Sequence, residues 1–394
     1  PALASNQGYS HPSAASSRMA RGTWQISRVA SLLATCAARA SLPRQASRPP
    51  VAHRRPVAYV PPFTSHVSRS RAVAMNSTQP AEVSTPEDQA PIGGNGAAGP
   101  RYGAARGAEP FASELNAKEL LTTQPAGAYT TMRTVGRTAL FDLGFHLQRL
   151  AESSRLMMEQ ESCGVLDCHA CLVDPSRLRP LVLESIRAAI QQFDVLNPEL
   201  NSQGEVRPTV LITWDREQST YEILSVVEPL PPRPSSPVLV QIAGLPRTNA
   251  AAKNSKWVQE RTALEDAAPP GCNEVLLMGP DGAVTEGLSS NFFVLQDGSL
   301  HTAEEGVLLG TVRDLVIKVA AREGIPLVLQ PPNVSFIDRW EGAFVTSTSR
   351  LMLLVDRIVM NGLPEPKVLD QTAELRRLEQ LVIDEIAFHS ESYL

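Results

Sequence analysis

The stretch from residue 284 to residue 295 constrains this chain most, because it reads Val-Thr-Glu-Gly-Leu-Ser-Ser-Asn-Phe-Phe-Val-Leu between two Asp-Gly pairs. Asp-Gly between apolar runs is a strong hairpin signal, since both residues tolerate a positive φ. We therefore expect three consecutive antiparallel strands, at residues 275–278, 283–295 and 300–302. The middle strand carries an acid, Glu286, in a run that should otherwise be buried. A buried carboxylate is costly without a positive partner, so Glu286 is either a paired, buried group or an exposed turn residue.

Three other segments supply groups that complement this acid. Lys253 lies 33 residues before Glu286, between an apolar run and the start of a helical pattern. Gly310 and Thr311 open a second helical pattern, and a helix N-terminus offers free N–H groups that suit a phosphate. A third segment ends in four consecutive hydroxyl side chains at residues 346–349. An amine, an acid and a phosphate cradle together are what a pyridoxal 5′-phosphate site needs.

From about residue 127 onwards, the chain resembles the fold-type IV, or class IV, aminotransferases. This group includes D-amino-acid aminotransferases, branched-chain aminotransferases and aminodeoxychorismate lyase. Between residues 284 and 349, four motifs carry the resemblance in order: Thr-Glu-Gly-x-Ser-Ser-Asn-Phe, Asp-Gly-x-Leu-x-Thr, Gly-x-x-Arg-Asp and Val-Thr-Ser-Thr. The Lys-Asn-Ser-Lys-Trp-Val segment, and Ala-Tyr-Thr-Thr-Met-Arg-Thr from Ala128, look most like a plant and algal subgroup. The resemblance implies an α+β fold with a smaller N-terminal α/β domain, a larger C-terminal β-rich domain and the site at their interface. It also implies a homodimer.

The resemblance further assigns roles within the site. Lys253 would bind the cofactor covalently and move the substrate proton, and the family's spacing to Glu286 favours it over the rival Lys256. Glu286 would lie against the pyridine nitrogen and keep it protonated. Tyr129 would line the pocket near the lysine. The groups expected on the cofactor phosphate are Arg149, in a matching His-x-x-Arg-Leu, the N–H groups of Thr311 and Val312, and Thr348.

The implied function is that of a PLP-dependent transaminase acting on an amino acid and 2-oxo acid pair, of the D-amino-acid or branched-chain type. An aminodeoxychorismate lyase shares the cofactor site and is the alternative, and a catalytically silent PLP-binding protein is a third hypothesis. The Arg and His that bind the substrate carboxylate in the D-amino-acid branch are not evident near residues 213–217. Trp257 also replaces smaller or polar residues of the better-known branches, so the substrate stays open.

The first part of the chain has the composition of a targeting segment. Residues 1–81 contain ten Arg, no Lys and no acid, and an Arg- and Ser-rich, acid-free leader is typical of organelle transit peptides. We expect a chloroplast transit peptide at residues 1–74, with a mitochondrial address as the alternative. A disordered linker at 75–112 should follow. The expected domains are then a small domain at 113–228, a Pro-rich linker at 229–237 and a large PLP-binding domain at 238–394.

Charge and cysteine usage exclude other classes. The remaining 26 of the 36 basic residues accompany all 41 acidic residues, and this net charge of −15 argues against nucleic acid as a partner. No apolar run reaches the roughly 18 residues that span a membrane. Cys163, Cys168 and Cys171 have the spacing of plant-type ferredoxin clusters. A fourth ligand would have to be remote, however, so we expect ordinary thiols and no metal.

The leader generates the first testable prediction. Residues 1–74 fused to a fluorescent protein should enter plastids, because an acid-free, Arg-rich segment suits import and cannot build a core. Fluorescence microscopy beside a plastid marker measures this. A fusion that stays diffuse in the cytosol would contradict it, and a mitochondrial pattern would favour the alternative address.

Overall fold

The computed structural model describes residues 101–161, 164–200 and 204–394. The expected transit peptide and most of the expected linker therefore lie outside the described residues. Helices and strands are mixed throughout the described part, which confirms the expected α+β fold. No helix in these ranges is both long and apolar enough to cross a membrane.

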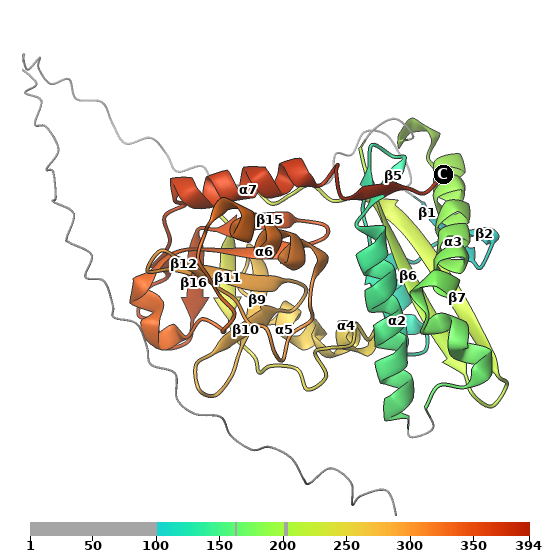
Figure 1. The fold of residues 1–394 in the computed structure, drawn as a ribbon, viewed down its shortest axis with the longest axis horizontal. Helices are drawn as coiled ribbons and strands as arrows, with labels where there is room; N and C mark the ends of the chain where they lie inside the picture. The colour runs from blue at the N-terminus through green and yellow to red at the C-terminus, as the bar shows by residue number, and fades with distance from the viewer. Residues whose placement is uncertain (1–100, 162–163, 201–203) are drawn as a thin grey trace, which may run out of the picture. The chain divides into compact units, whose positions relative to one another are not determined.

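The first part of the fold is an antiparallel sheet with two long helices on it. The strand order is β2-β1-β7-β6-β3. The strands are β1 (Tyr102–Arg106), β2 (Glu109–Ser113), β3 (Ala128–Thr131), β6 (Val206–Asp215) and β7 (Thr220–Pro229). Helices α2 (Leu143–Gln160) and α3 (Pro175–Leu196) lie along this sheet (Figure 1). Their apolar faces and the sheet form one hydrophobic cluster, so α2 is held where its polar face can serve a site.

The expected linker at residues 75–112 is too long, because β1 and β2 begin inside it. The Gly-Ala-Ala run that resembles linker composition lets α3 pack closely on β1. A Cβ on Gly103 would lie 2.2 Å from the backbone nitrogen of Phe193 and 2.4 Å from the carbonyl oxygen of Ala189. Small residues here therefore indicate close packing of a strand on a helix. The proposed division at 229–237 stays a prediction.

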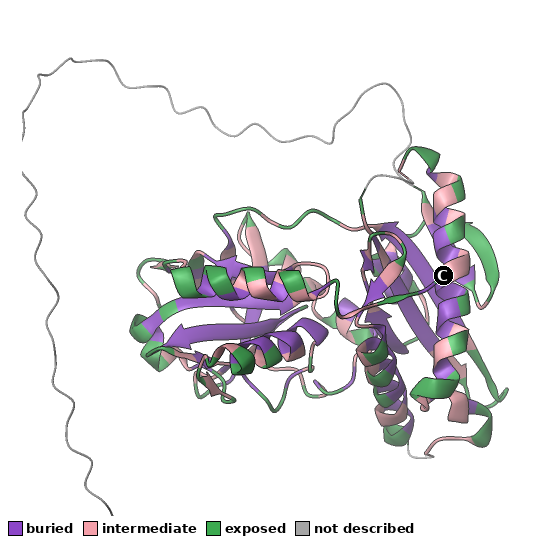
Figure 2. Cartoon of the chain, turned by 45° about the horizontal axis from the view of Figure 1, so that its top comes forward, coloured by how far each residue is buried: buried purple, intermediate pink, exposed green. Residues whose placement is uncertain are grey.

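The second part is a larger sheet covered by helices. Eight strands follow the order β13-β12-β11-β10-β9-β8-β16-β17, and β14 pairs with β11 and β15. The strands are β8 (Leu239–Ile242), β9 (Cys272–Met278), β10 (Val284–Gly287), β11 (Asn291–Gln296), β12 (Ser299–His301), β13 (Leu327–Val328), β14 (Trp340–Ser347), β15 (Leu351–Val355), β16 (Arg357–Met360) and β17 (Lys367–Val368). Helices α6 (Thr311–Glu323) and α7 (Ala373–Glu385) share an apolar cluster with β11, β14 and β15. In Figure 2 the strands are largely buried and the helices expose one side.

The single strand expected at residues 283–295 is wrong, because the structure breaks it into β10 and β11. The N–H of Gly287 donates to the carbonyl of Ser290 at 2.8 Å, which closes a tight turn between these strands. The N–H of Leu288 donates to the carbonyl of Val275 at 2.9 Å. The glycine and serines that interrupt the apolar run thus form a loop, and Glu286 comes just before it.

The end of the chain returns to its first part. Strand β18 (Ser390–Ser392) pairs with β5 (Ala139–Phe141), which also pairs with β4 (Thr134–Val135). Tyr393 is buried in the hydrophobic cluster of the first sheet, and its hydroxyl donates to the carbonyl of Arg137, 256 residues away.

The close packing of β1 on α3 generates a stability prediction. Gly103→Ala should lower the free energy of unfolding by about 1–3 kcal/mol or more, because the added methyl group meets helix backbone, which cannot move aside cheaply. Chemical denaturation measures this. The control is Gly144→Ala in α2, where the nearest atom to the new Cβ is a carboxylate oxygen of Glu391 at 3.5 Å, and its effect should stay within about 1 kcal/mol. Equal effects of the two changes would contradict the packing argument.

Candidate functional site

A cavity of about 530 Å³ is lined by residues from both sheets. All seven residues expected in the site line it: Tyr129, Arg149, Lys253, Glu286, Thr311, Val312 and Thr348. Tyr129 comes from β3 and Arg149 from α2, while the rest follow β8. The structure therefore brings the predicted residues together, and their individual roles stay predictions.

One end of the cavity is built to hold an anion. Helix α6 starts with Gly310 as its N-cap and has no side-chain cap, so the first N–H groups of the helix are available. The hydroxyls of Thr311 and Thr348 lie 3.1 Å apart. A Cβ on Gly310 would lie 2.3 Å from the side-chain oxygen of Asn291, which explains the glycine at this turn. Arg149 reaches the same place, with one guanidinium nitrogen 3.4 Å from the carbonyl of Leu309.

Arg149 is oriented by two neighbours that the sequence did not reveal. Its guanidinium donates to the Thr130 hydroxyl at 3.1 Å and to Nδ1 of His146 at 3.2 Å. The Thr130 hydroxyl and Nδ1 are 2.8 Å apart. Because a guanidinium only donates, Nδ1 must accept, and the proton of a neutral His146 then resides on Nε2. Burial, followed by the charges of Arg149 and Lys253, holds the pKa of His146 well below its usual value. Burial also lowers the pKa of Arg149 to about 10, so Arg149 remains a cation at neutral pH.

Lys253 is fixed through its backbone to two elements of the first part of the fold, α2 and β3. Its N–H donates to the hydroxyl of Ser153 on α2 at 3.0 Å, and its carbonyl accepts from the N–H of Tyr129 at 3.0 Å. The Lys253 amine lies 4.5 Å from the centre of the Tyr129 ring. Burial, then the positive charges of Arg149, Arg247 and Arg261, hold the pKa of Lys253 well below its usual value. The amine is therefore biased towards its uncharged, nucleophilic form.

The rival lysine lies elsewhere. Lys256 begins helix α4 (Lys256–Glu260), its side chain is 64% exposed, and its amine pairs with Glu260 at 3.4 Å. It is not among the residues that line the cavity. The geometry therefore favours Lys253.

Glu286 is buried, with 3% of its surface exposed, so the alternative of an exposed turn residue is wrong. One carboxylate oxygen accepts from Nε of Arg247 at 2.7 Å, and the other accepts from the N–H of Leu308 at 2.9 Å. Burial raises the pKa of Glu286, and Arg247 opposes that rise. Each carboxylate oxygen has lone pairs left, so Glu286 can accept one further hydrogen bond from a ligand.

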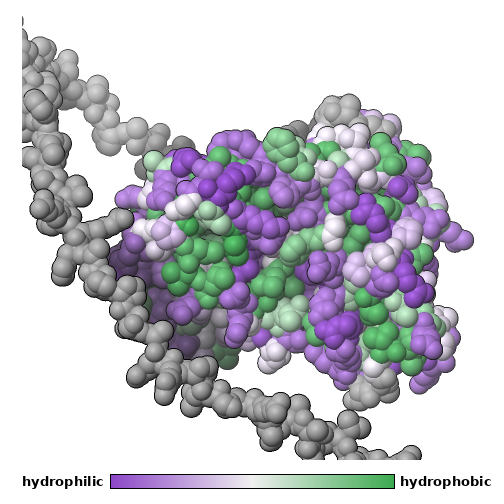
Figure 3. Space-filling view, viewed as in Figure 1, coloured by the Kyte–Doolittle hydropathy of each residue, from purple (hydrophilic) through white to green (hydrophobic). Residues whose placement is uncertain are grey.

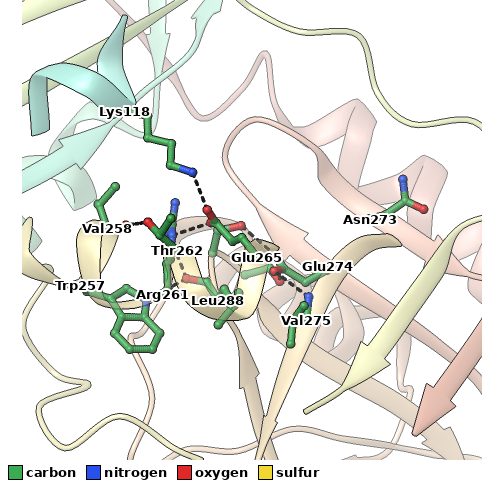
Figure 4. Close-up of polar contacts among 12 residues, drawn as sticks. Lys118, Trp257, Val258, Arg261, Thr262, Glu265, Asn273, Glu274, Val275 and Leu288 are labelled. Atoms are coloured by element: carbon green, nitrogen blue, oxygen red, sulfur yellow. Dashed lines mark hydrogen bonds and ion pairs between the residues drawn. The ribbon is translucent and has the colours of Figure 1, made fainter. Parts of the chain in front are cut away.

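Arg247, which the sequence did not single out, lines the cavity beside Trp257 and Arg261, which Figure 4 shows together with Leu288. Its guanidinium lies 5.4 Å from the centre of the Trp257 ring. The indole N–H of Trp257 and a guanidinium N–H of Arg261 both donate to the carbonyl of Leu288, at 2.9 and 3.0 Å. Arg261 pairs with Glu265 at 2.8 Å.

The network of polar contacts in Figure 4 also includes a residue of helix α1 (Ala117–Thr123). Lys118, on this helix, donates to Glu265 at 2.6 Å, and Glu265 lies on helix α5 (Thr262–Asp266). Helix α1, which contributes Lys118 to the cavity lining, is therefore joined to α5 by an ion pair.

A second buried network fixes the loop after Glu286. Glu274 on β9 is buried, and its carboxylate accepts from the hydroxyls of Ser289 and Ser290 at 2.8 Å each and from Arg350. Arg350 also donates to the carbonyl of Asn273 at 2.7 Å. Although burial raises the pKa of Glu274, Arg350 and the hydroxyls outweigh it and hold that pKa below its usual value. The two serines thus bind an ion pair that the sequence pattern alone could not identify.

Among the described cysteines, Cys272 lines the cavity, whereas Cys168 and Cys171 do not. Cys168, Cys171 and Cys272 are free thiols, and Cys163 lies outside the described residues. Within the described ranges, no group of three or more His, Cys, Asp or Glu residues is placed to hold a metal ion.

The residues of the cavity fit pyridoxal 5′-phosphate. The Thr346 hydroxyl and Nε of Arg149 are buried without a hydrogen-bond partner in the described structure. The helix N-terminus and Arg149 suit a phosphate, Lys253 suits an aldehyde, and Glu286 suits a protonated ring nitrogen. A buried lysine with a lowered pKa, a buried acid and an anion cradle around one cavity are the groups that a PLP-dependent enzyme uses.

Comparison with known proteins identifies the family. The sequence model of amino-transferase class IV matches residues 127–358, so the chain belongs to the class IV aminotransferases. This family is PLP-dependent.

Two curated relatives match short regions of the chain. A branched-chain-amino-acid aminotransferase of Pseudomonas aeruginosa is 30% identical over 100 residues, which cover 25% of this chain and 33% of the relative. A putative branched-chain-amino-acid aminotransferase of Methanocaldococcus jannaschii is 32% identical over 103 residues, which cover 26% of this chain and 36% of the relative. The aligned region thus spans about a third of these relatives.

Solved structures match over most of the described chain. A branched-chain aminotransferase from Thermoproteus uzoniensis, with norvaline, has a TM-score of 0.57 at 17% identity, covering 75% of this chain and 100% of that one. A hypothetical aminotransferase from Mycobacterium tuberculosis, in a PLP-bound form, has a TM-score of 0.54 at 21% identity, covering 73% and 99%. At these identities the likeness establishes the shared fold-type IV architecture.

The buried lysine generates a pH-dependent stability prediction. The folded state lowers the pKa of Lys253 below its unfolded value of about 10.4, so the unfolded state binds more protons between the two values. Lys253→Met should therefore stabilise the cofactor-free protein, and the gain should shrink as pH rises, by up to about 1.4 kcal/mol per pH unit. Chemical unfolding at pH 7, 8 and 9 measures this. The control is Lys256→Met at an exposed position, and the same trend in both variants would contradict the prediction.

Proposed function

We propose that this chain is a PLP-dependent aminotransferase acting on an amino acid and 2-oxo acid pair. The observation that carries the proposal is the Lys253 amine, buried in one cavity with the carboxylate of Glu286 and the anion cradle of α6. A structural lysine would instead be paired or exposed, as Lys256 is. Family membership supports the same reaction class.

The residues divide the chemistry between them. Pyridoxal 5′-phosphate supplies an aldehyde that binds amines and a ring that withdraws electrons. Lys253 would hold the aldehyde, and its amine is the base placed to take the substrate Cα proton. Glu286 would hold the proton on the ring nitrogen, and Arg247 opposes the rise in the pKa of Glu286 that burial causes. Tyr129 packs beside Lys253 and limits where its amine can move.

The wall beyond the cofactor residues suits a carboxylate substrate with an apolar side chain. Arg207 on β6 lines the cavity, although it pairs with Glu228. Arg207 precedes residues 213–217 in the sequence, the segment where the carboxylate-binding Arg and His of the D-amino-acid branch are not evident. Trp257 and Leu288 provide apolar lining near the mouth. Because the curated relatives carry branched-chain names, branched-chain amino acids are the substrates that we propose first. D-amino acids and membership of the plant and algal subgroup remain proposals from resemblance.

Two further features concern the place and the assembly of the protein. We place the protein in plastids because of the composition of residues 1–81. We propose a homodimer because of the family resemblance. Figure 3 shows apolar areas between hydrophilic ones on one face of the molecule, which is compatible with a partner surface.

The function is tested by following the absorbance of the PLP-loaded protein during titration with L- and D-amino acids. A transaminase should convert its bound cofactor to the amine form with its own substrates, and a 2-oxo acid should restore the original spectrum. A silent binding protein should show no change with any amino acid. Pyruvate release from aminodeoxychorismate without a 2-oxo acid acceptor would instead indicate the lyase. Borohydride reduction should place the cofactor label on the peptide position of Lys253, and a label on Lys256 would overturn the assignment.

Glu286→Gln separates catalytic support from structural support. The neutral amide keeps the size of the side chain but cannot hold a proton on the ring nitrogen, so the half-reaction rate should fall about 100-fold or more, equivalent to about 2.7 kcal/mol. Cofactor affinity should fall less, since the phosphate contacts remain. The rate and the affinity are both measured with the best amino acid found. Glu260→Gln, at an exposed acid on α4, is the control. A near-normal rate in Glu286→Gln would mean that Glu286 is not the partner of the ring nitrogen.

A further inference from the structure

Trp257 lines the cavity and also makes two specific contacts, one through its indole N–H and one through its ring face. Its indole N–H donates to the carbonyl of Leu288 at 2.9 Å, which anchors one edge of the ring on the loop after β10. Its face lies against the guanidinium of Arg247, 5.4 Å from carbon to ring centre. The ring is thus held from one side and contacts a cation on another.

Arg247 needs such a contact, because only part of its guanidinium is fixed by hydrogen bonds. Nε donates to Glu286 at 2.7 Å and one Nη donates to the carbonyl of Ala250 at 3.1 Å. Its side chain is 10% exposed and that of Glu286 is 4% exposed. Breaking a buried ion pair by displacing one partner is costly, because the other charge stays buried. A flat aromatic surface under the guanidinium restricts it to the plane in which Nε meets the carboxylate.

From this geometry we propose that Trp257 is a positioning residue, whose indole face holds the Arg247 guanidinium on Glu286. Trp257 does not touch the reacting atoms in this role and acts through Arg247. The inference rests on the proposed roles of Lys253 and Glu286. Its test needs no turnover, however, so its failure can be told apart from failure of the proposed function.

The Lys253 amine reports the position of Arg247. The charged groups that act on this amine are Arg149 from α2, Arg247, Arg261 and Glu286 from β10. Arg247 disfavours protonation of the amine directly, and by lowering the pKa of Glu286 it also maintains a negative charge that favours protonation. The direct effect of Arg247 on the amine is larger than the effect of Glu286. If Arg247 loses its place, Lys253 should become more protonated and less reactive at a given pH.

The experiment is trace labelling of the full-length, cofactor-free chain with acetic anhydride over a series of pH values. Mass spectrometry of the peptide that carries both lysines compares Lys253 with Lys256, which is exposed and serves as the internal reference. On the part of the pH curve where the Lys253 amine is mostly protonated, Trp257→Leu should lower the labelling of Lys253 relative to Lys256 about fivefold, because labelling there follows the fraction of free amine. Trp257→Phe keeps an aromatic face but loses the N–H, and should stay within about twofold of the wild type.

The Arg247→Gln background supplies the decisive control. Arg247→Gln alone should lower the relative labelling of Lys253, and adding Trp257→Leu should lower it no further, because both changes remove the same interaction. Water that entered the cavity in place of the indole would also change the labelling of Lys253. It would do so equally in the Arg247→Gln background. The proposal is overturned if Trp257→Phe behaves like Trp257→Leu, if Trp257→Leu leaves the labelling unchanged or still lowers it without Arg247, or if Arg247→Gln alone has no effect. The measurement on Arg247→Gln alone still tests the proposal if Trp257→Leu does not fold.

Discussion

The buried pair of Arg247 and Glu286 is the interaction on which the site depends. A carboxylate with 3% exposure would be protonated or forced towards solvent without a cation beside it. With Arg247 at 2.7 Å and the N–H of Leu308 on its other oxygen, Glu286 can stay in the cavity as an anion. The helix that carries Trp257, through the contact with Arg247, and the segment before α6, through Leu308, both meet strand β10 at this pair. The pair therefore joins three of the segments that line the cavity.

Positive charge dominates the rest of the cavity, and this has two effects. Arg149, Arg247 and Arg261 disfavour a charge on Lys253, so the cations create the free amine that binds an aldehyde. Arg247 and Arg261 are paired with Glu286 and Glu265, whereas Arg149 has no carboxylate partner among the described residues. A phosphate bound at the start of α6 would neutralise the charge of Arg149. Binding and stability are linked through one set of side chains.

The sequence was informative wherever a contact is local. The Asp297–Gly298 turn has φ values of 50° and 70°, as the hairpin pattern predicts, and Lys253, Glu286, Thr311 and Thr348 all lie at element ends that turn chemistry marks. Contacts that depend on tertiary packing could not be predicted from the sequence. Arg247 stands in a loop without a motif, and nothing in the pattern tells that its partner is 39 residues away. The Gly-Ala run of β1 has linker composition, and only the approach of α3 explains it.

Strand β18 has a consequence for the order of folding. The partner of this strand, β5, is synthesised about 250 residues earlier, but the edge of β5 can be completed only after residues 390–392 have been made. The hydrophobic cluster of the first sheet likewise lacks Tyr393 until then. During translation the chain must therefore keep an open strand edge and a partly filled core for a long time. Chaperone dependence, and sensitivity to ribosome stalling before residue 390, should be concentrated in the first sheet and its helices.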